Sequence, residues 1–81
     1  MELTGKRIVI VGLGQSGVAA ARLCRARGAR VVATDSAPLE SLSAAARSLD
    51  AELFAGSHAG VPFTGADLIV VSPGVPPLAE L

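Results

Sequence analysis

Residues 8–17 read IVIVGLGQSG, and this stretch decides the fold. Ile8 to Val11 form a β-branched run without polar alternation, which is typical of a strand buried on both faces of a parallel sheet. The glycines end the strand, and a helical pattern follows from Ser16 to Arg27, with Ala20, Leu23 and Cys24 on one face. A strand, a glycine-rich turn and a helix in this order indicate the first half of a βαβ unit.

The rest of the chain continues the alternation of strands and helices. Gly28 ends the first helix, and Pro38 begins a second one whose apolar stripe is Leu39, Leu42, Ala46 and Leu49. Three further strands are expected, at Arg30 to Thr34, Glu52 to Ala55, and Asp67 to Val71. Because this alternation favours parallel pairing through right-handed crossovers, we predict an α/β fold, a Rossmann-like doubly wound parallel sheet with strand order 3-2-1-4.

The length of the chain, 81 residues, allows one small domain over residues 1–81. Pro76, Pro77 and Leu78 resemble the entry to another helix, and no strand follows them to complete the pattern. We therefore expect the domain to be truncated at its C-terminal end, and the natural protein to be longer.

The composition argues against several classes of partner. Seven basic residues balance seven acidic ones, and Phe54 and Phe63 are the two aromatic residues, so no nucleic-acid partner is expected. No window approaches the ~20 apolar residues that span a bilayer, so no membrane partner is expected either. The single cysteine, Cys24, cannot form an internal disulfide, which favours a cytoplasmic location.

The glycine-rich turn is the first candidate site. Its sequence matches G-x-G-x-x-G between a strand and a helix, which is the context that this motif needs. Gly12 allows the tight turn, Gly14 lets the backbone approach a ligand, and Gly17 lets the helix pack closely on the strand. Free backbone N–H groups at the start of the helix, together with the helix dipole, then favour an anion such as a diphosphate. The alternative is a glycine-rich turn that binds nothing.

Two further segments end at the same edge of the predicted sheet. Asp35 lies 18 residues after Gly17, where a nucleotide-binding βαβ unit places an acidic residue for ribose hydroxyls, although it could instead serve a turn or a helix start. Ser36 could bond a ligand or cap the helix. The loop Ser72-Pro73-Gly74-Val75-Pro76 leaves the fourth strand beside the first, where the strand order reverses and ligands bind. An ordinary rigid turn would have the same sequence pattern.

Two residues that often carry chemistry are assigned no catalytic role. His58 lies in a loop without a second His, Cys or carboxylate at metal-ligand spacing, so we expect a surface residue and no metal site. Cys24 is expected on the core face of the first helix as an inert hydrophobe. No catalytic residue is therefore predicted in this chain.

Three features together resemble the Mur ligase family. They are the strand with its glycine turn at residues 8–17, the strand that ends at Asp35, and the segment ADLIVVSPGVP at residues 66–76. The last segment is the most specific, because nicotinamide-binding domains share the glycine turn but not a fourth strand that ends in Ser-Pro-Gly-Val-Pro. The likeness spans nearly the whole chain.

The resemblance implies an N-terminal domain of a three-domain cytoplasmic ligase of peptidoglycan synthesis. Such a domain binds the UDP part of UDP-N-acetylmuramoyl-L-alanine, while a central domain uses ATP and magnesium to activate the substrate for D-glutamate, and a C-terminal domain completes the enzyme. This chain contains no G-x-x-x-x-G-K-[ST] loop, so ATP has no visible site and the chain alone is expected to have no ligase activity. No cofactor is expected to bind this domain itself.

By the same resemblance, Gly14, Gln15 and Ser16 should contact the diphosphate, and Asp35 and Ser36 the uridine. Ser72, Pro73 and Gly74 should contact the sugar nucleotide from the facing loop. Some family members carry a basic residue two positions after the acidic one, where this chain has Ala37. Any contact that depends on that basic residue is lost.

Two other functions fit parts of the pattern. An NAD-binding module of an oxidoreductase would show the same glycine turn and Asp35, although no arginine closely follows Asp35, which disfavours NADP. A unit that binds no nucleotide and serves only folding or interaction is the third possibility. The loop from Ser72 to Pro76 favours the Mur ligase interpretation over both.

Overall fold

The computed structural model describes residues 2–72, and these residues form one four-stranded parallel sheet. The strands are β1 (Arg7–Val11), β2 (Arg30–Asp35), β3 (Glu52–Ala55) and β4 (Leu68–Val71). Their order is β3-β2-β1-β4, so the predicted α/β class and strand order are both confirmed. Ile8 of β1 pairs with Val31 of β2 and with Leu68 of β4, which makes β1 an interior strand with a neighbour on each side.

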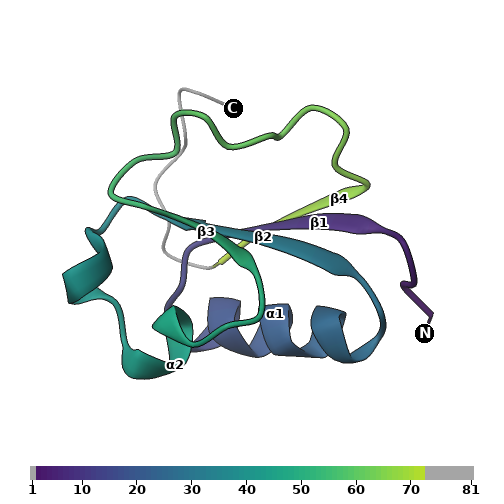
Figure 1. Ribbon diagram of the computed structural model, residues 1–81, viewed down its shortest axis with the longest axis horizontal. Coiled ribbons are helices and arrows are strands. Elements are labelled where there is room, and N and C mark those ends of the chain that lie inside the picture. The colour runs from purple at the N-terminus through teal and green to yellow at the C-terminus, as the bar shows by residue number, and fades with distance from the viewer. Residues whose placement is uncertain (1, 73–81) are drawn as a thin grey trace.

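The two faces of the sheet are covered by different segments (Figure 1). Helices α1 (Gln15–Ala26) and α2 (Ala44–Arg47) lie on one face, and the loop of residues 56–67 crosses the other. Strand alternation divides the core accordingly, because Ile8 and Ile10 pack under the helices while Val9 and Val11 pack under the loop with Val61. The β1 side chains from Ile8 to Val11 are 0–1% exposed, as a strand buried on both faces requires.

The prediction of one continuous helix after Pro38 is wrong. A 3-10 helix, η1 (Leu39–Ser41), is followed by extended backbone at Leu42 and Ser43 and then by the short helix α2. The Ser43 hydroxyl accepts a hydrogen bond of 3.1 Å from the Ala46 N–H and so caps the N-terminus of α2. A separate helix therefore begins at a position where the predicted helix would have continued. Leu42 and Ala46 of the expected stripe are buried, but Leu39 is 49% exposed.

The buried face of α1 also differs from the prediction. Gly17, Val18, Ala21 and Cys24 are buried, whereas Leu23 is 56% exposed and Ala20 is half-buried. The close approach of Gly17 to the glycine turn fixes how the helix is rotated, and the residues four and seven positions further on, Ala21 and Cys24, then face the sheet. The predicted core position of Cys24 is confirmed, and that of Leu23 is not.

His58 is buried, which contradicts its predicted surface position. The residue is 6% exposed, and its Nδ1 lies 2.7 Å from the hydroxyl oxygen of Thr34, which is itself fully buried. Thr34 lies in β2 on the face that the 56–67 loop covers, where a hydroxyl needs a partner because it is out of contact with water. His58 supplies that partner from the loop.

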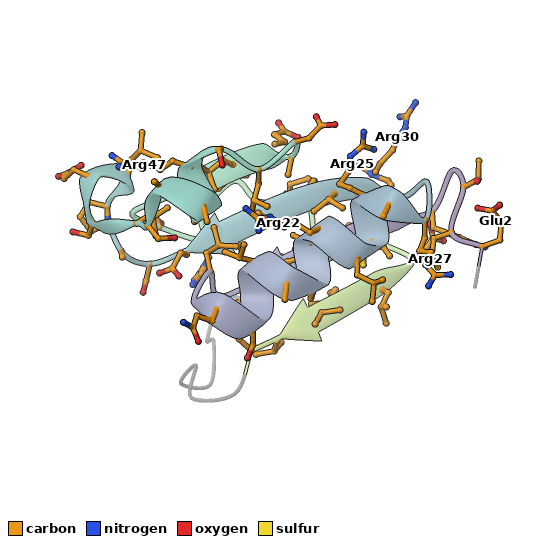
Figure 2. The ribbon with its side chains drawn as sticks, turned by 90° about the horizontal axis from the view of Figure 1, so that it is seen from below. Glu2, Arg22, Arg25, Arg27, Arg30 and Arg47 are labelled. Atoms are coloured by element: carbon orange, nitrogen blue, oxygen red, sulfur yellow. The ribbon has the colours of Figure 1, made fainter. Side chains whose placement is uncertain are left out.

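Charged side chains lie mainly around the rim of the molecule (Figure 2). Arg25 near the end of α1 donates to the Asp50 carboxylate at 2.6 Å from Nη2 and at 3.2 Å from Nε. At the N-terminus, hydrogen bonds donated by the hydroxyl and the N–H of Thr4 lower the pKa of the Glu2 carboxyl. Both carboxylates are exposed, so these contacts contribute little to stability.

Strand β4 lies at one edge of the sheet in the described part of the chain, and it is poorly covered there. Leu68, Ile69 and Val71 are 52%, 40% and 47% exposed.

The helices within residues 2–72 are all too short or too polar to cross a membrane.

Candidate functional site

The glycine turn joins β1 to α1 at the carboxyl-terminal edge of the sheet. Gly12 has φ of 94°, a conformation that other residues rarely adopt, and its N–H donates to the Thr34 carbonyl oxygen at 2.8 Å. A Cβ atom on Gly17 would lie 1.7 Å from the Gly12 carbonyl oxygen, so only a glycine allows this packing. The roles predicted for Gly12 and Gly17 in the turn therefore match the geometry.

The N-terminus of α1 is open. Gly14 is the N-cap residue and provides no side-chain cap, and the first turn contains no acidic residue. A Cβ added to Gly14 would meet no atom within 4 Å, while Gln15 and Ser16 are exposed. Since the first N–H groups of a helix have no partner within the helix, this end of α1 can receive an anion.

Asp35, the last residue of β2, reaches across to the glycine turn. Its Oδ2 accepts a hydrogen bond of 2.7 Å from the Leu13 N–H, and its Oδ1 accepts one of 2.9 Å from the Ala37 N–H. The second bond closes a turn over Ser36, which is the local role weighed against ligand binding. An ionised carboxylate has about four lone-pair positions, so two remain available for hydroxyl groups of a ligand.

Ser72 follows β4 and lies against the other side of the turn. Its N–H donates to the Val11 carbonyl oxygen at 2.9 Å, and its hydroxyl donates to the Gly12 carbonyl oxygen at 3.1 Å. The loop after the fourth strand therefore begins beside the first strand, as predicted. Pro73 and Gly74 lie outside the described residues.

A groove of about 670 Å³ opens between α1 and the segment that follows β2. The glycine turn forms one end of the groove, and the side chains along it are mainly small or apolar. The residues that line it are Leu13, Gly14, Gln15, Val18, Ala19, Arg22, Asp35, Ala37, Ser41, Leu42, Ser43 and Ala45. A concave, largely apolar groove with a few polar groups is typical of a small-molecule site.

The groove brings together Gly14, Gln15 and Asp35 among the predicted site residues. Ser16 and Ser36 are exposed next to lining residues, whereas Ser72 contacts the turn from the β4 side. Sequence reasoning missed the wall formed by residues 41–45 and the α1 side chains beyond the first turn. Positions 15, 18, 19 and 22 repeat at helical spacing from the glycine turn, and this spacing could have identified that face of α1.

Within residues 2–72, no three His, Cys, Asp or Glu side chains gather in a way that could hold a metal ion. The polar groups that line the groove are backbone N–H donors, one carboxylate, the side-chain amide of Gln15, serine hydroxyls and a guanidinium. These groups can bind and orient a ligand with an anionic end and polar hydroxyls.

The sequence profile of the family described as "Mur ligase MurD-like, N-terminal domain" matches residues 6–80. The chain belongs to this Mur ligase family. The matched range includes the glycine turn, Asp35, Ser72 and every residue that lines the groove of this Mur ligase domain.

Several curated relatives of the Mur ligase domain are ligases of the same name. UDP-N-acetylmuramoylalanine--D-glutamate ligase of Anaeromyxobacter dehalogenans is 52% identical over 77 residues, 93% of this chain. The ligases of the same name from Geotalea uraniireducens and Acidobacterium capsulatum are 49% and 48% identical over 79 residues, 94% of this chain. The chain spans 17% of the length of each of these relatives. No solved structure matches it.

Proposed function

We propose that this domain binds the uridine diphosphate part of UDP-N-acetylmuramoyl-L-alanine in an ATP-dependent ligase that adds D-glutamate during peptidoglycan synthesis. The observation that carries the proposal is the groove that starts at the open N-terminus of α1 and passes the Asp35 carboxylate. The names of the relatives supply the substrate.

The chemistry of the groove suits a nucleoside diphosphate. A diphosphate would accept hydrogen bonds from the N–H groups at residues 14–16, where the helix dipole is favourable and no acidic side chain lies in the first turn. Ribose hydroxyls would donate to the free lone pairs of Asp35. Ser72 would approach the sugar nucleotide from the β4 side. The resemblance assigns contacts with the sugar nucleotide to Pro73 and Gly74 as well, which lie outside the described residues.

The remaining requirements of the reaction are assigned to the full-length ligase. ATP and magnesium activate the substrate carboxylate in the family that the sequence resembles, and the chain has no P-loop sequence. D-Glutamate would likewise meet the parts of the ligase that lie outside this chain. A cytoplasmic location belongs to the same proposal, because the resemblance implies it.

Isothermal titration calorimetry can test the proposal directly. UDP-N-acetylmuramoyl-L-alanine, UDP and NADH should be titrated into the chain under one set of buffer conditions. We expect both uridine nucleotides to bind more tightly than NADH. Tighter binding of NADH would favour the oxidoreductase alternative, and an absence of binding for all three would reject a nucleotide site.

A further inference from the structure

The loop of residues 56–67 is tied to the end of β2 on the face of the sheet that α1 and α2 do not cover (Figure 1). The Gly56 N–H donates to the carbonyl oxygens of Asp35 and Ala37, at 3.0 and 2.8 Å. Two residues further on, Nδ1 of His58 lies 2.7 Å from the Thr34 hydroxyl oxygen. The start of the loop is therefore attached to the last two residues of β2 by hydrogen bonds.

The same end of β2 supports the candidate site. The Thr34 carbonyl oxygen accepts from the Gly12 N–H at 2.8 Å, and the Asp35 carboxylate accepts from the Leu13 N–H at 2.7 Å. Because successive side chains of a strand point to opposite faces, the Asp35 carboxylate lines the groove while the Thr34 hydroxyl lies under the loop. A displacement of Thr34 would therefore affect both the glycine turn and the carboxylate.

The Thr34 hydroxyl depends on His58 for its hydrogen bond. Thr34 is fully buried and His58 is 6% exposed, and the buried cluster on this face of the sheet consists of valines. Within residues 2–72, no other hydrogen-bond partner of the hydroxyl is found. A buried hydroxyl without a partner is unfavourable, and a strand end can relieve it by opening locally to water. Such opening at the end of β2 would separate it from the glycine turn.

We propose that His58 is a positioning residue of the nucleotide site, because through Thr34 it holds the end of β2 where the glycine turn and the Asp35 carboxylate face one ligand. This inference rests on the proposed binding of a uridine nucleotide. His58 lies on the opposite face of the sheet from the groove, so its effect on affinity is indirect and comes from preorganisation. By linkage, a bound nucleotide in turn stabilises the closed loop.

The test compares the wild-type chain with His58→Leu, His58→Asn and Val61→Ala. Leucine is apolar and offers no hydrogen bond, whereas the asparagine amide is attached to Cγ, as Nδ1 is in histidine, and can bond the hydroxyl. Val61→Ala is the matched control, because Val61 is buried in the same loop and its truncation loosens packing without removing the bond to Thr34. Circular dichroism verifies that each protein is folded at the temperature used.

Two quantities are measured on each protein. Amide hydrogen exchange followed by NMR, without ligand, reports on Gly12 and Leu13, and the amide of Ile10 inside β1 is the reference for opening of the whole sheet. Calorimetry gives the affinity for UDP. In the wild type alone, exchange of the Val61 amide is also compared with and without saturating UDP.

We expect His58→Leu to speed exchange of the Gly12 and Leu13 amides about tenfold relative to Ile10, and to weaken UDP binding about fivefold. His58→Asn should restore both quantities towards the wild-type values. Val61→Ala should leave both unchanged, although it destabilises the fold. In the wild type, UDP should slow exchange of the Val61 amide relative to Ile10.

Wild-type exchange ratios and UDP affinity in His58→Leu would overturn the role of His58 and leave the proposed function intact. Faster exchange with unchanged UDP affinity would also overturn it, because the role of His58 would then be structural only. Equal changes in Val61→Ala would assign the effect to packing of the loop and not to the hydrogen bond.

If His58→Leu does not fold, a Val61 amide that exchanges equally fast relative to Ile10 with and without UDP overturns the inference. A wild-type chain that does not bind UDP would reject the proposed function, and the positioning role of His58 with it.

Discussion

The Leu13 N–H donates a hydrogen bond of 2.7 Å to Oδ2 of Asp35, and this bond ties the glycine turn to the end of β2. The same carboxylate accepts from the Ala37 N–H at 2.9 Å, so it also shapes the exit from the strand. Asp35 thus orders both sides of the groove before any ligand arrives. The carboxylate at this position therefore stabilises the fold and, in our proposal, also accepts hydrogen bonds from the ribose hydroxyls.

Replacement of Asp35 should therefore affect stability as well as binding. Asp35→Ala removes two hydrogen bonds to a charged, half-buried acceptor, so we expect the free energy of unfolding to fall by about 2 kcal/mol. Asp35→Asn keeps one acceptor oxygen and should lose about 1 kcal/mol. Urea denaturation measures both values. An alanine variant as stable as the wild type would show that neither hydrogen bond contributes to folding.

The two glycines at the start of α1 should respond differently to alanine. At Gly17 the added Cβ would lie 1.7 Å from the Gly12 carbonyl oxygen, and relief requires the helix to move off the turn, so we expect a loss of about 3 kcal/mol or more. At Gly14 the Cβ would meet nothing within 4 Å, and we expect a loss below about 1 kcal/mol. Thermal and urea denaturation of the two variants provide the comparison. Equal losses would contradict the packing at Gly17.

Gly14→Val should weaken UDP binding more than it weakens folding. The space beside Gly14 contains no protein atom within 4 Å, and a valine there would occupy the path by which a diphosphate approaches the backbone. We expect the affinity for UDP to fall about tenfold or more, while the loss of folding free energy is about 1 kcal/mol. Calorimetry and urea denaturation should use the same preparation. A folded variant with wild-type affinity would remove Gly14 from the site.

The strands and the glycine turn were predictable because each has a strong local cause. The β-branched run at residues 8–11 has no polar alternation, and Gly12 and Gly17 are required by a positive φ and by a close contact that any side chain would prevent. The strand order followed from the alternation of elements, since parallel strands need crossovers of one hand.

The segment between β2 and β3 was less predictable because two signals compete in it. Leucine and alanine spacing favours one helix, but Ser43 can cap a new helix, and its hydrogen bond to the Ala46 N–H prevails. The break places residues 41–45 along the groove, so the wall of the candidate site depends on a local choice that periodicity does not reveal.

The burial of His58 depends on a contact between residues 24 positions apart, which no local pattern contains. The sequence nevertheless contained a signal, because Thr34 follows the apolar run from Val31 to Ala33 and places a hydroxyl on the same strand face as Val32. A buried hydroxyl requires a hydrogen-bond partner, and His58 is the polar ring in the loop that covers this face.

The hydrogen bond between Thr34 and His58 should couple the 56–67 loop to the sheet energetically. Thr34→Val leaves Nδ1 of His58 without its hydrogen-bond partner, and His58→Leu leaves the Thr34 hydroxyl without its hydrogen-bond partner. Each single variant should therefore lose about 1 to 3 kcal/mol of unfolding free energy. The double variant removes both polar groups and should lose less than the sum of the two, by at least about 1 kcal/mol. Urea denaturation of the four proteins gives this coupling free energy, with Ser48→Ala as an exposed control for the loss of a hydroxyl. Additive losses would mean that the two side chains are merely adjacent, and that apolar packing of Val61 on the sheet holds the loop without them.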